Sequence, residues 1–303
     1  MYTEFYQLDL KPFSLTPDPS FLYLSTVHRK CATVLQYGMM NNTGFTVVAG
    51  EIGSGKSTLI QHLLNSIDTN QVNIGHINNT FKIHDDLLAW VLDAFDVAVD
   101  PDSSRIDRYR KFTDFVITEY SEGRRVALII DEAQNLDVDS IEELRLLSNI
   151  NIAEDIILQM VFVGQPELVS LLEHPRLKQF AQRIGIEFNI PPLDFAETKK
   201  YIEHRLDVAG AKRPLFSEDA MAALYCYSGG LPRKINNMAD MALVYGYAEE
   251  AEMIDAHVVN DTITDRIKSG LFKLGSRDSG GAKVVEEWLE QTQNISLVKS
   301  EEV

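Results

Sequence analysis

Eight consecutive residues carry the strongest signal in this 303-residue sequence: Gly50-Glu51-Ile52-Gly53-Ser54-Gly55-Lys56-Ser57. They match the pattern G-x-x-x-x-G-K-[ST], in which each defined position has a physical task. The glycines allow backbone conformations that other residues avoid, so that successive N–H groups approach a phosphate and form an anion-binding nest. Lys56 supplies a charge for the β- and γ-phosphates, and the Ser57 hydroxyl is a ligand for Mg²⁺. The stretch therefore predicts a loop that holds a nucleoside triphosphate with magnesium.

The residues on either side of this loop fit the same interpretation. Phe45–Ala49 is an apolar, β-branched run typical of a strand, and Thr58–Ser66 has the pattern of a helix. A helix that begins directly behind the loop adds its N-terminal dipole to the anion site. We therefore expect residues 50–58, including Thr58, to bind ATP.

A second signal follows 75 residues after Lys56, where the apolar run Val126–Ile130 ends in Asp131 and Glu132. In an open parallel sheet, ligands bind at the edge where the strands end. Asp131 is expected to hold Mg²⁺, directly or through water, and Glu132 to orient and activate the attacking water. An Asp-Glu strand end is weak evidence by itself, but together with the phosphate loop it predicts hydrolysis of ATP to ADP and phosphate.

Short apolar runs alternate with helical patterns between residues 44 and 190. The expected strands are Phe45–Ala49, Val72–Ile77, Val126–Ile130, Ile157–Val163 and Gly185–Ile190. The expected helices between them are Thr58–Ser66, Asp85–Phe95, Arg108–Tyr120 and Ser140–Leu147. Alternation of this kind predicts an α/β fold, with a five-stranded parallel sheet sandwiched by helices.

The character of the sequence changes after Pro191-Pro192, where helical patterns follow one another without a convincing strand. They cover Glu197–Ala209, Glu218–Ser228, Arg233–Glu249 and Ala256–Ser269. We therefore expect four regions: an N-terminal extended segment with a first helix packing on the core (1–43), the nucleotide-binding domain (44–190), a small all-helical domain (191–270), and a linker with a flexible acidic tail (271–303). The first 25 residues are a clamp on the core or a wall of a ligand pocket. The tail contains a short helix-like piece with Val284, Val285, Trp288 and Leu289, and it is floppy or docks on a partner.

Composition and charge restrict the class of function. Asp and Glu number 45 against 28 Lys and Arg, for a formal net charge of −17. Such a surface repels nucleic-acid backbones and argues against a general nucleic-acid binder, although a local basic strip remains compatible with it. The two cysteines show no metal-ligand spacing or disulfide framework, and no secretory signal or membrane-spanning run is visible. We expect a soluble, cytoplasmic protein.

Several short boxes follow one another along residues 1–265. They include Phe5-Tyr6, Pro12-Phe13, Thr16-Pro17-Asp18-Pro19, Phe21-Leu22-Tyr23, Asp131-Glu132-Ala133-Gln134-Asn135-Leu136, Leu144-Arg145-Leu146-Leu147-Ser148-Asn149, Val163-Gly164-Gln165-Pro166-Glu167-Leu168, Gln182-Arg183-Ile184 and Gly229-Gly230-Leu231-Pro232-Arg233. In these boxes the chain resembles the AAA+ ATPases, and more closely the ExeA/GspA-type secretion ATPases with their relatives in pilus and exopolysaccharide export. The resemblance implies a P-loop AAA+ fold in which the helical domain is a lid.

The resemblance also implies roles for residues outside the two motifs. Gln165 follows the fourth strand, where the family's first sensor contacts the γ-phosphate and the attacking water. Arg183 precedes the fifth strand, in the position of the arginine finger that reaches a neighbour's nucleotide, and Arg176 is the second candidate. Arg233, at the start of a helix, matches the second sensor, which ties the lid to the γ-phosphate.

For the N-terminal box, the resemblance implies that Tyr23 and His28 lie near adenine. The function it implies is that of a homo-oligomeric ATPase, completed by Arg183 in trans, that assembles or energises an envelope secretion, pilus or polysaccharide export system. A protein partner would then hold it at the inner membrane. The alternatives are a DNA-binding AAA+ regulator of transposition or replication initiation, and a nucleotide switch without significant turnover.

Overall fold

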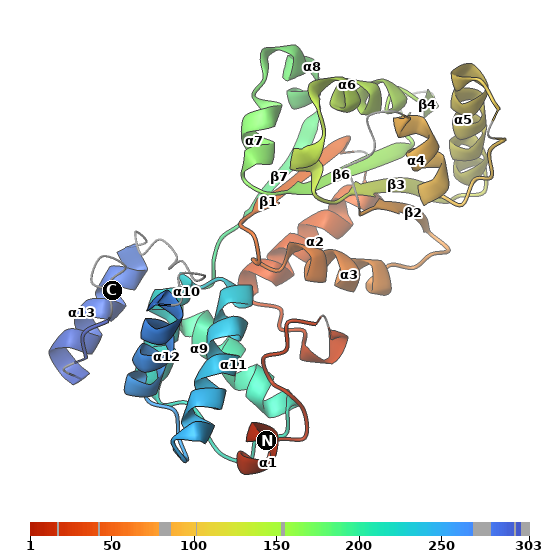
Figure 1. Ribbon diagram of the computed structural model, residues 1–303. Helices are drawn as coiled ribbons and strands as arrows, with labels where there is room; N and C mark the ends of the chain where they lie inside the picture. Colours follow the sequence, from red (N-terminus) through yellow and green to blue (C-terminus); the bar gives the residue numbers. More distant parts are fainter. Residues whose placement is uncertain are drawn as a thin grey trace. The chain divides into compact units, whose positions relative to one another are not determined.

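The computed structural model describes residues 1–16, 18–41, 43–78, 86–100, 102–152, 155–268, 280–293 and 295–297. The chain divides into two compact units (Figure 1). The sheet unit comprises Thr26–Glu51 and Lys56–Ile190, and the helical unit comprises Met1–Ser25, Ile52–Gly55 and Pro191–Val303.

A five-stranded, fully parallel sheet forms the centre of the sheet unit. The strand order is β2-β3-β6-β1-β7, and the strands are β1 (Phe45–Gly50), β2 (Val72–Ile77), β3 (Arg125–Ile130), β6 (Leu158–Gly164) and β7 (Ile184–Ile190). All residues of β1 and β6 are buried, as expected for apolar strands covered on both faces. Because the strands are parallel, the segments that follow β1, β3 and β6 all leave the same edge of the sheet.

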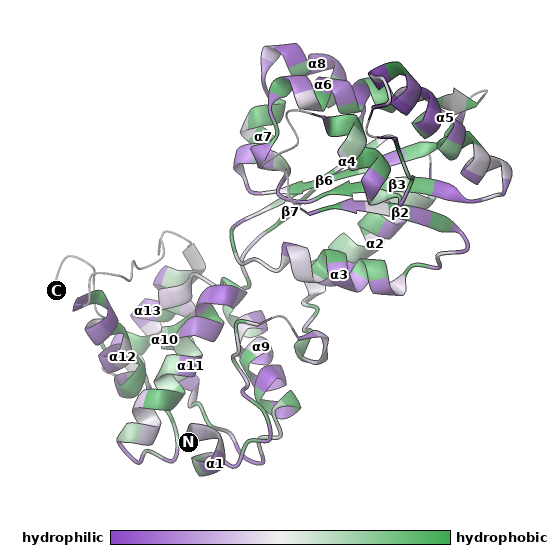
Figure 2. Cartoon of the chain, turned by 45° about the vertical axis from the view of Figure 1, so that its right-hand side comes forward, coloured by the Kyte–Doolittle hydropathy of each residue, from purple (hydrophilic) through white to green (hydrophobic). Residues whose placement is uncertain are grey.

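Helices cover both faces of this sheet. Figure 1 shows α2 (Thr26–Met40) and α3 (Lys56–Ser66) on one face and, on the other, α4 (Leu87–Ala94), α5 (Arg105–Ser121), α6 (Val138–Leu147), α7 (Glu167–Leu172) and α8 (Lys178–Ala181). Hydropathy follows this layering, with apolar residues on the strands and polar residues on the outer turns of α5 and α6 (Figure 2). The predicted α/β fold with five parallel strands is therefore confirmed.

Polar caps fix where several of these helices begin. The side chains of Asp86, Ser104 and Asp137 accept backbone N–H groups at the starts of α4, α5 and α6. Asp85, the predicted first residue of α4, lies outside the described residues. A short antiparallel pair, β4 (Asn151–Ile152) and β5 (Asp155–Ile156), connects α6 to β6 and was not predicted.

The helical unit is organised around α10 (Glu218–Ser228), whose residues from Ala220 onward are all buried. Around it pack α9 (Phe195–Val208), α11 (Pro232–Ala248), α12 (Ala256–Lys268) and α13 (Gly280–Gln293). Gly229 ends α10 in the left-handed conformation (φ 63°), and Pro232 opens α11 at a position where its missing N–H is harmless. Among the described helices of both units, none has the length and apolar character needed to span a bilayer.

The first 25 residues belong to the helical unit, and not to the nucleotide-binding core on which we expected them to pack. We call residues 1–25 the strap; it contains α1 (Tyr2–Phe5) and the 3-10 turn η1 (Pro19–Phe21). Its aromatic side chains explain the difference, because they join the apolar core of the helical unit: Tyr2, Tyr6, Phe13 and Phe21. Of the predicted N-terminal region 1–43, only the part from Thr26 onward, which contains α2, belongs to the sheet unit.

One buried cation anchors the strap. The guanidinium of Arg205 on α9 donates to the carbonyl oxygens of Pro12 and Ser14. It also lies 4.8 Å from the ring centroid of Phe21. A proline-rich segment does not form regular helix or strand, so its carbonyl oxygens lack the usual backbone N–H partners. Here the guanidinium of Arg205 donates to two of them.

The C-terminal region also differs from the predicted flexible tail. Residues 280–293 form α13, which packs against α10 and buries Ala282 and Leu289. Ile295 and Leu297 continue the same contact, and Asn260 on α12 donates to the carbonyl of Ser296 at 3.2 Å. The helix thus buries Ala282 and Leu289 against its own chain, whereas Val284 is exposed. Residues 271–279 of the predicted linker and tail lie outside the described residues.

Candidate nucleotide-binding site

The loop after β1 has the backbone that its sequence predicts. Gly53 and Gly55 adopt positive φ angles of 81° and 100°, which only glycine adopts without strain. Gly53 lies against Arg233 within the helical unit, so closely that an added Cβ would stand 2.6 Å from the Cβ of Arg233. The N-terminus of α3 begins at Lys56, directly behind the loop.

Lys56 is held in place by the loop itself. Its ammonium donates to the carbonyl oxygens of Gly50 at 2.6 Å and Glu51 at 3.0 Å, and the residue is only 6% exposed. Burial lowers the pKa of Lys56 below its ordinary value, while nearby carboxylates, chiefly Glu132 and Asp131, oppose this shift. The result is a fixed, partly desolvated cation beside two carboxylates.

The predicted magnesium ligands come together at the same edge of the sheet. The hydroxyl of Ser57, at the start of α3, donates to Oδ2 of Asp131 at 3.2 Å, and Asp131 is 6% exposed. A hydroxyl and one carboxylate suit Mg²⁺, which takes one or two protein oxygens and completes its shell with phosphate oxygens and water. Within the described part of the chain, no group of three or more His, Cys, Asp or Glu side chains is placed to hold another metal.

Glu132 is held by two glutamine side chains. Its Oε2 accepts the amide of Gln134 at 2.6 Å and the amide of Gln165 at 3.1 Å. The backbone N–H of Gln165 in turn donates to Oε1 of Gln134 at 3.0 Å. The structure thus brings Gln165 to the carboxylate of Glu132, beside Asp131, whereas the sensor role implied for Gln165 stays a prediction. No role was predicted for Gln134, although it stands only two residues after Glu132.

The two candidate finger arginines differ in their surroundings. Arg183 donates to Oδ1 of Asn149 at 2.7 Å and to the carbonyl of Ser148 at 3.4 Å, and it lies 5.3 Å from the ring centroid of Phe45. Burial, assisted by the nearby charge of Arg145, lowers the pKa of Arg183. Arg176 is 59% exposed and pairs with Asp139 on the surface of the sheet unit. Arg183 is therefore bound to its own chain, whereas Arg176 is more accessible.

The remaining predicted residues fall in both units. In the helical unit, the backbone N–H of Arg233 donates to the carbonyl of Gly53 at 3.3 Å. The Tyr23 hydroxyl of the strap donates to Oε2 of Glu197 at 2.5 Å, and its ring packs near His204. His28 is a buried residue of α2 in the sheet unit. Roles for these three residues at the γ-phosphate or near adenine stay predictions.

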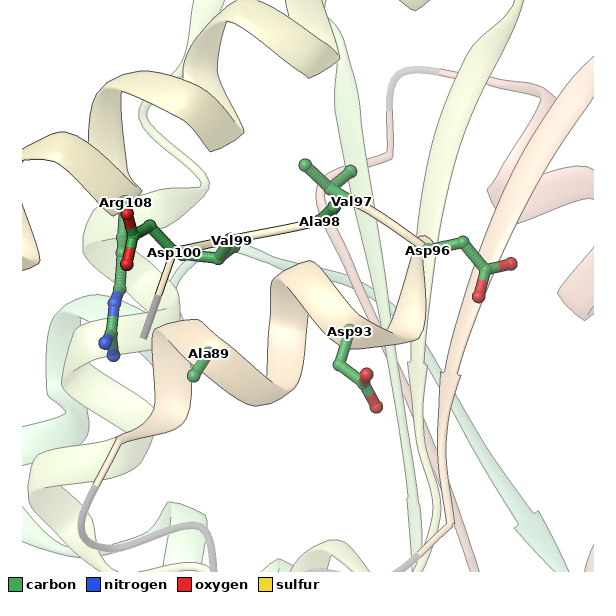
Figure 3. A pocket seen from close by; sticks show the side chains of 8 residues that line it. All are labelled: Ala89, Asp93, Asp96, Val97, Ala98, Val99, Asp100 and Arg108. Carbon is green, nitrogen blue, oxygen red and sulfur yellow. The ribbon is translucent and has the colours of Figure 1, made fainter. Parts of the chain in front are cut away.

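A cavity of about 390 Å³ lies elsewhere in the sheet unit, between α4, the segment that follows it and the start of α5. Asp100 and Arg108 stand at one end of it, and Asp93 and Asp96 at the other (Figure 3). None of the phosphate-site residues lines this cavity. Its three carboxylates repel a triphosphate, so it is not the predicted nucleotide site.

Comparison with known proteins agrees with this geometry. Residues 39–172 match the family model described as AAA domain. The chain is an AAA+ protein. It is 37% identical over 254 residues to General secretion pathway protein A of Aeromonas hydrophila, a match that covers 84% of this chain and 46% of that protein. The AAA+ chain thus spans about half the length of this curated relative.

Solved structures share the fold of this AAA+ chain. The ORC2 protein of Aeropyrum pernix, in ADPNP–ADP complexes, has a TM-score of 0.62 at 14% identity over 96% of this chain and 86% of its own. Drosophila ORC bound to DNA has a TM-score of 0.64 at 12% identity over 88% of this chain and 67% of its own. The resemblance to ExeA/GspA-type AAA+ ATPases, inferred from sequence boxes, is confirmed.

Proposed function

We propose that this AAA+ chain binds ATP with Mg²⁺ and hydrolyses it to ADP and phosphate. The observation that supports this most strongly is one cluster at the sheet edge: the buried ammonium of Lys56, the Ser57–Asp131 pair and the carboxylate of Glu132. Each group has a place in phosphoryl transfer, which depends on positioning and on neutralising charge.

The proposed reaction is in-line attack of water on the γ-phosphorus. The oxygen of water bonds to phosphorus while the bond to the β-phosphate oxygen breaks, and ADP leaves. Glu132 orients the water and accepts its proton, while Lys56 neutralises charge on the transferred group. Ser57 and Asp131 would hold Mg²⁺, which would supply positive charge to the phosphates of the nucleotide.

Two substitutions test this mechanism. Glu132→Gln should bind ATP with wild-type affinity but release phosphate about 10²- to 10⁴-fold more slowly, because the general base is lost. Lys56→Ala should lose ATP binding, because it removes the cation that faces the phosphates. Phosphate release and calorimetric ATP binding, both with Mg²⁺, are the measurements. Wild-type turnover by Glu132→Gln contradicts the assigned role.

We further propose that a second copy of the chain completes the site with an arginine, since such a residue neutralises transition-state charge. The accessible Arg176 is placed more favourably than Arg183, which has several partners on its own chain. Arg176→Ala and Arg183→Ala are each mixed with the Lys56→Ala variant. The variant that lacks the true finger arginine should be inactive alone. It should regain activity in the mixture, because the Lys56→Ala copy supplies that arginine to its intact nucleotide site, whereas a misfolded variant does not regain activity.

For the biological role, we propose an oligomeric factor that assembles or energises an envelope secretion, pilus or polysaccharide export system. The relationship to a General secretion pathway protein supports this proposal. The DNA-binding alternative is opposed by the net charge of −17. A DNA-binding assay at two salt concentrations decides between them, because phosphate contacts weaken steeply with salt.

A further inference from the structure

The side chain of Gln134 bridges two strand ends of the sheet unit. Its amide nitrogen donates to Oε2 of Glu132 at 2.6 Å, and its amide oxygen accepts the backbone N–H of Gln165 at 3.0 Å. Gln134 stands on the 3-10 turn η3 (Ala133–Asn135) that follows β3, while Gln165 directly follows β6. Both ends of a single amide group are therefore used to join the proposed water-activating carboxylate to the neighbouring strand.

The backbone is shaped to permit this bridge. Glu132 has a positive φ of 52°, a conformation unfavourable for glutamate. It lies two residues after the end of β3 and begins a sharp turn, in which the N–H of Asn135 donates to the carbonyl of Glu132 at 3.0 Å. Backbone outliers of this kind concentrate at functional sites. The turn brings Gln134 back beside Glu132.

Gly164 supplies the space that the bridge occupies. A Cβ added at this last residue of β6 would lie 2.7 Å from Oε1 of Gln134 and 3.0 Å from a methyl carbon of Leu168. A side chain at this position would displace the amide of Gln134. The sheet edge thus combines a strained turn on one strand with a glycine on the next, and the side chain of Gln134 lies between them.

We propose that Gln134 is a positioning residue that fixes the direction of the Glu132 carboxylate for attack by water, an inference that rests on the proposed ATP hydrolysis. Gln134 and Gln165 donate to the same carboxylate oxygen, and hydrogen bonds to a charged acceptor are strong. A carboxylate fixed in this way needs little reorganisation in the transition state. Only a residue with both a donor and an acceptor at its tip can make both contacts.

The test compares steady-state hydrolysis by Gln134→Leu and Gln134→Glu with that of the wild type at about pH 8. Both variants should lower kcat about 10- to 100-fold, the effect of losing a hydrogen bond to a charged group that acts in the transition state. KM and the directly measured Kd for Mg-ATP should stay within about 3-fold of wild type. The exposed Gln61→Leu on α3 is the matched control and keeps the wild-type kcat.

Gln134→Glu separates positioning from a structural role. It has the size of glutamine and retains the acceptor for the Gln165 N–H, but it replaces the donor to Glu132 with a second negative charge. If Gln134 serves only to tie down residue 165, this variant retains wild-type kcat and the proposal is wrong. If thermal melting shows that Gln134→Leu does not fold, the Gln134→Glu variant alone provides the test.

A double substitution shows whether Gln134 acts through Glu132. Adding Gln134→Leu to Glu132→Gln should cause no further loss of kcat, because the group it positions is already gone. An additional loss equal to that of the single variant contradicts the proposal. If the wild type shows no Mg-dependent phosphate release, both the proposed hydrolysis and the positioning role of Gln134 are wrong. If the wild type is active, the variants test the positioning role alone.

Discussion

At the scale of single residues, Lys56 shows how the site is prepared for an anion. The chain holds a desolvated ammonium against two carbonyl oxygens and near carboxylates. Burial disfavours the charged form of lysine, so the pKa of Lys56 falls below 10.5. The negative charges of a triphosphate act in the opposite direction and favour the ammonium.

The affinity for ATP should therefore fall as the pH rises toward the lowered pKa of Lys56. Above that pKa, free Lys56 is neutral and must take up a proton when the triphosphate binds, which costs binding free energy. Binding is measured between about pH 7.5 and about pH 9.5, in buffers of different ionisation enthalpy so that proton uptake is counted. Lys56→Arg stays charged throughout, so its affinity, whatever its value at neutral pH, should change less over this range.

The sequence predicts some of these residues better than others. Lys56, Ser57, Asp131 and Glu132 follow from two local motifs, and the parallel sheet brings the motifs together. The role proposed for Gln134 depends on the φ angle of Glu132 and on the space at Gly164, two properties that no periodic pattern reports. Likewise, the partners of Arg183 come from α6 and the turn after it, distant in sequence.

At the scale of secondary-structure elements, prediction succeeds where apolar periodicity is strong. Val72–Ile77 and Glu218–Ser228 have their predicted bounds, and the other strands of the five-stranded sheet differ by about one residue at one or both ends. The short helices α7 and α8 escaped prediction because six and four residues are too few to show a period. In α13, the apolar spacing predicts a helix but does not show which surface it covers; Leu289 is fully buried.

The packing of α13 gives a prediction at this scale. Leu289→Ala should detach α13 from α10 or lower the stability of the helical unit by about 2–4 kcal/mol, because it empties a fully buried site. Val284→Ala on the same helix is the control, since Val284 is 65% exposed. Urea unfolding and the rate of proteolytic cleavage within 280–297 are measured. Equal behaviour of the two variants contradicts the packing of α13.

At the scale of the whole molecule, the chain passes between the two units more than once. It leaves the strap for the sheet unit at Ser25–Thr26 and returns to the helical unit at Ile190–Pro191. The composition change at Pro191-Pro192 predicts the second boundary. The boundary at Ser25–Thr26 was not predicted, because the aromatic residues of the strap have no periodicity that indicates which surface they cover.

Arg205 should be essential for the strap. Arg205→Ala removes the charged donor from the carbonyls of Pro12 and Ser14, so we expect the helical unit to lose about 2–4 kcal/mol of stability. Residues 1–25 should then become sensitive to protease. The exposed Arg213, paired with Glu252 in the same unit, is the control, and its Ala variant should match the wild type in both measurements.

The long-range contacts of the strap have a consequence for synthesis of the protein. The hydroxyl of Tyr2 donates to Asp240 on α11 at 2.6 Å, and that of Tyr6 donates to the carbonyl of Ala251 at 3.0 Å. A ribosome adding about 5–20 residues per second needs roughly 12–50 seconds to make the intervening chain. During that time the aromatic side chains of the strap lack these partners. The strap is therefore translated well before the segments that bury it, and we expect it to need protection by chaperones during synthesis.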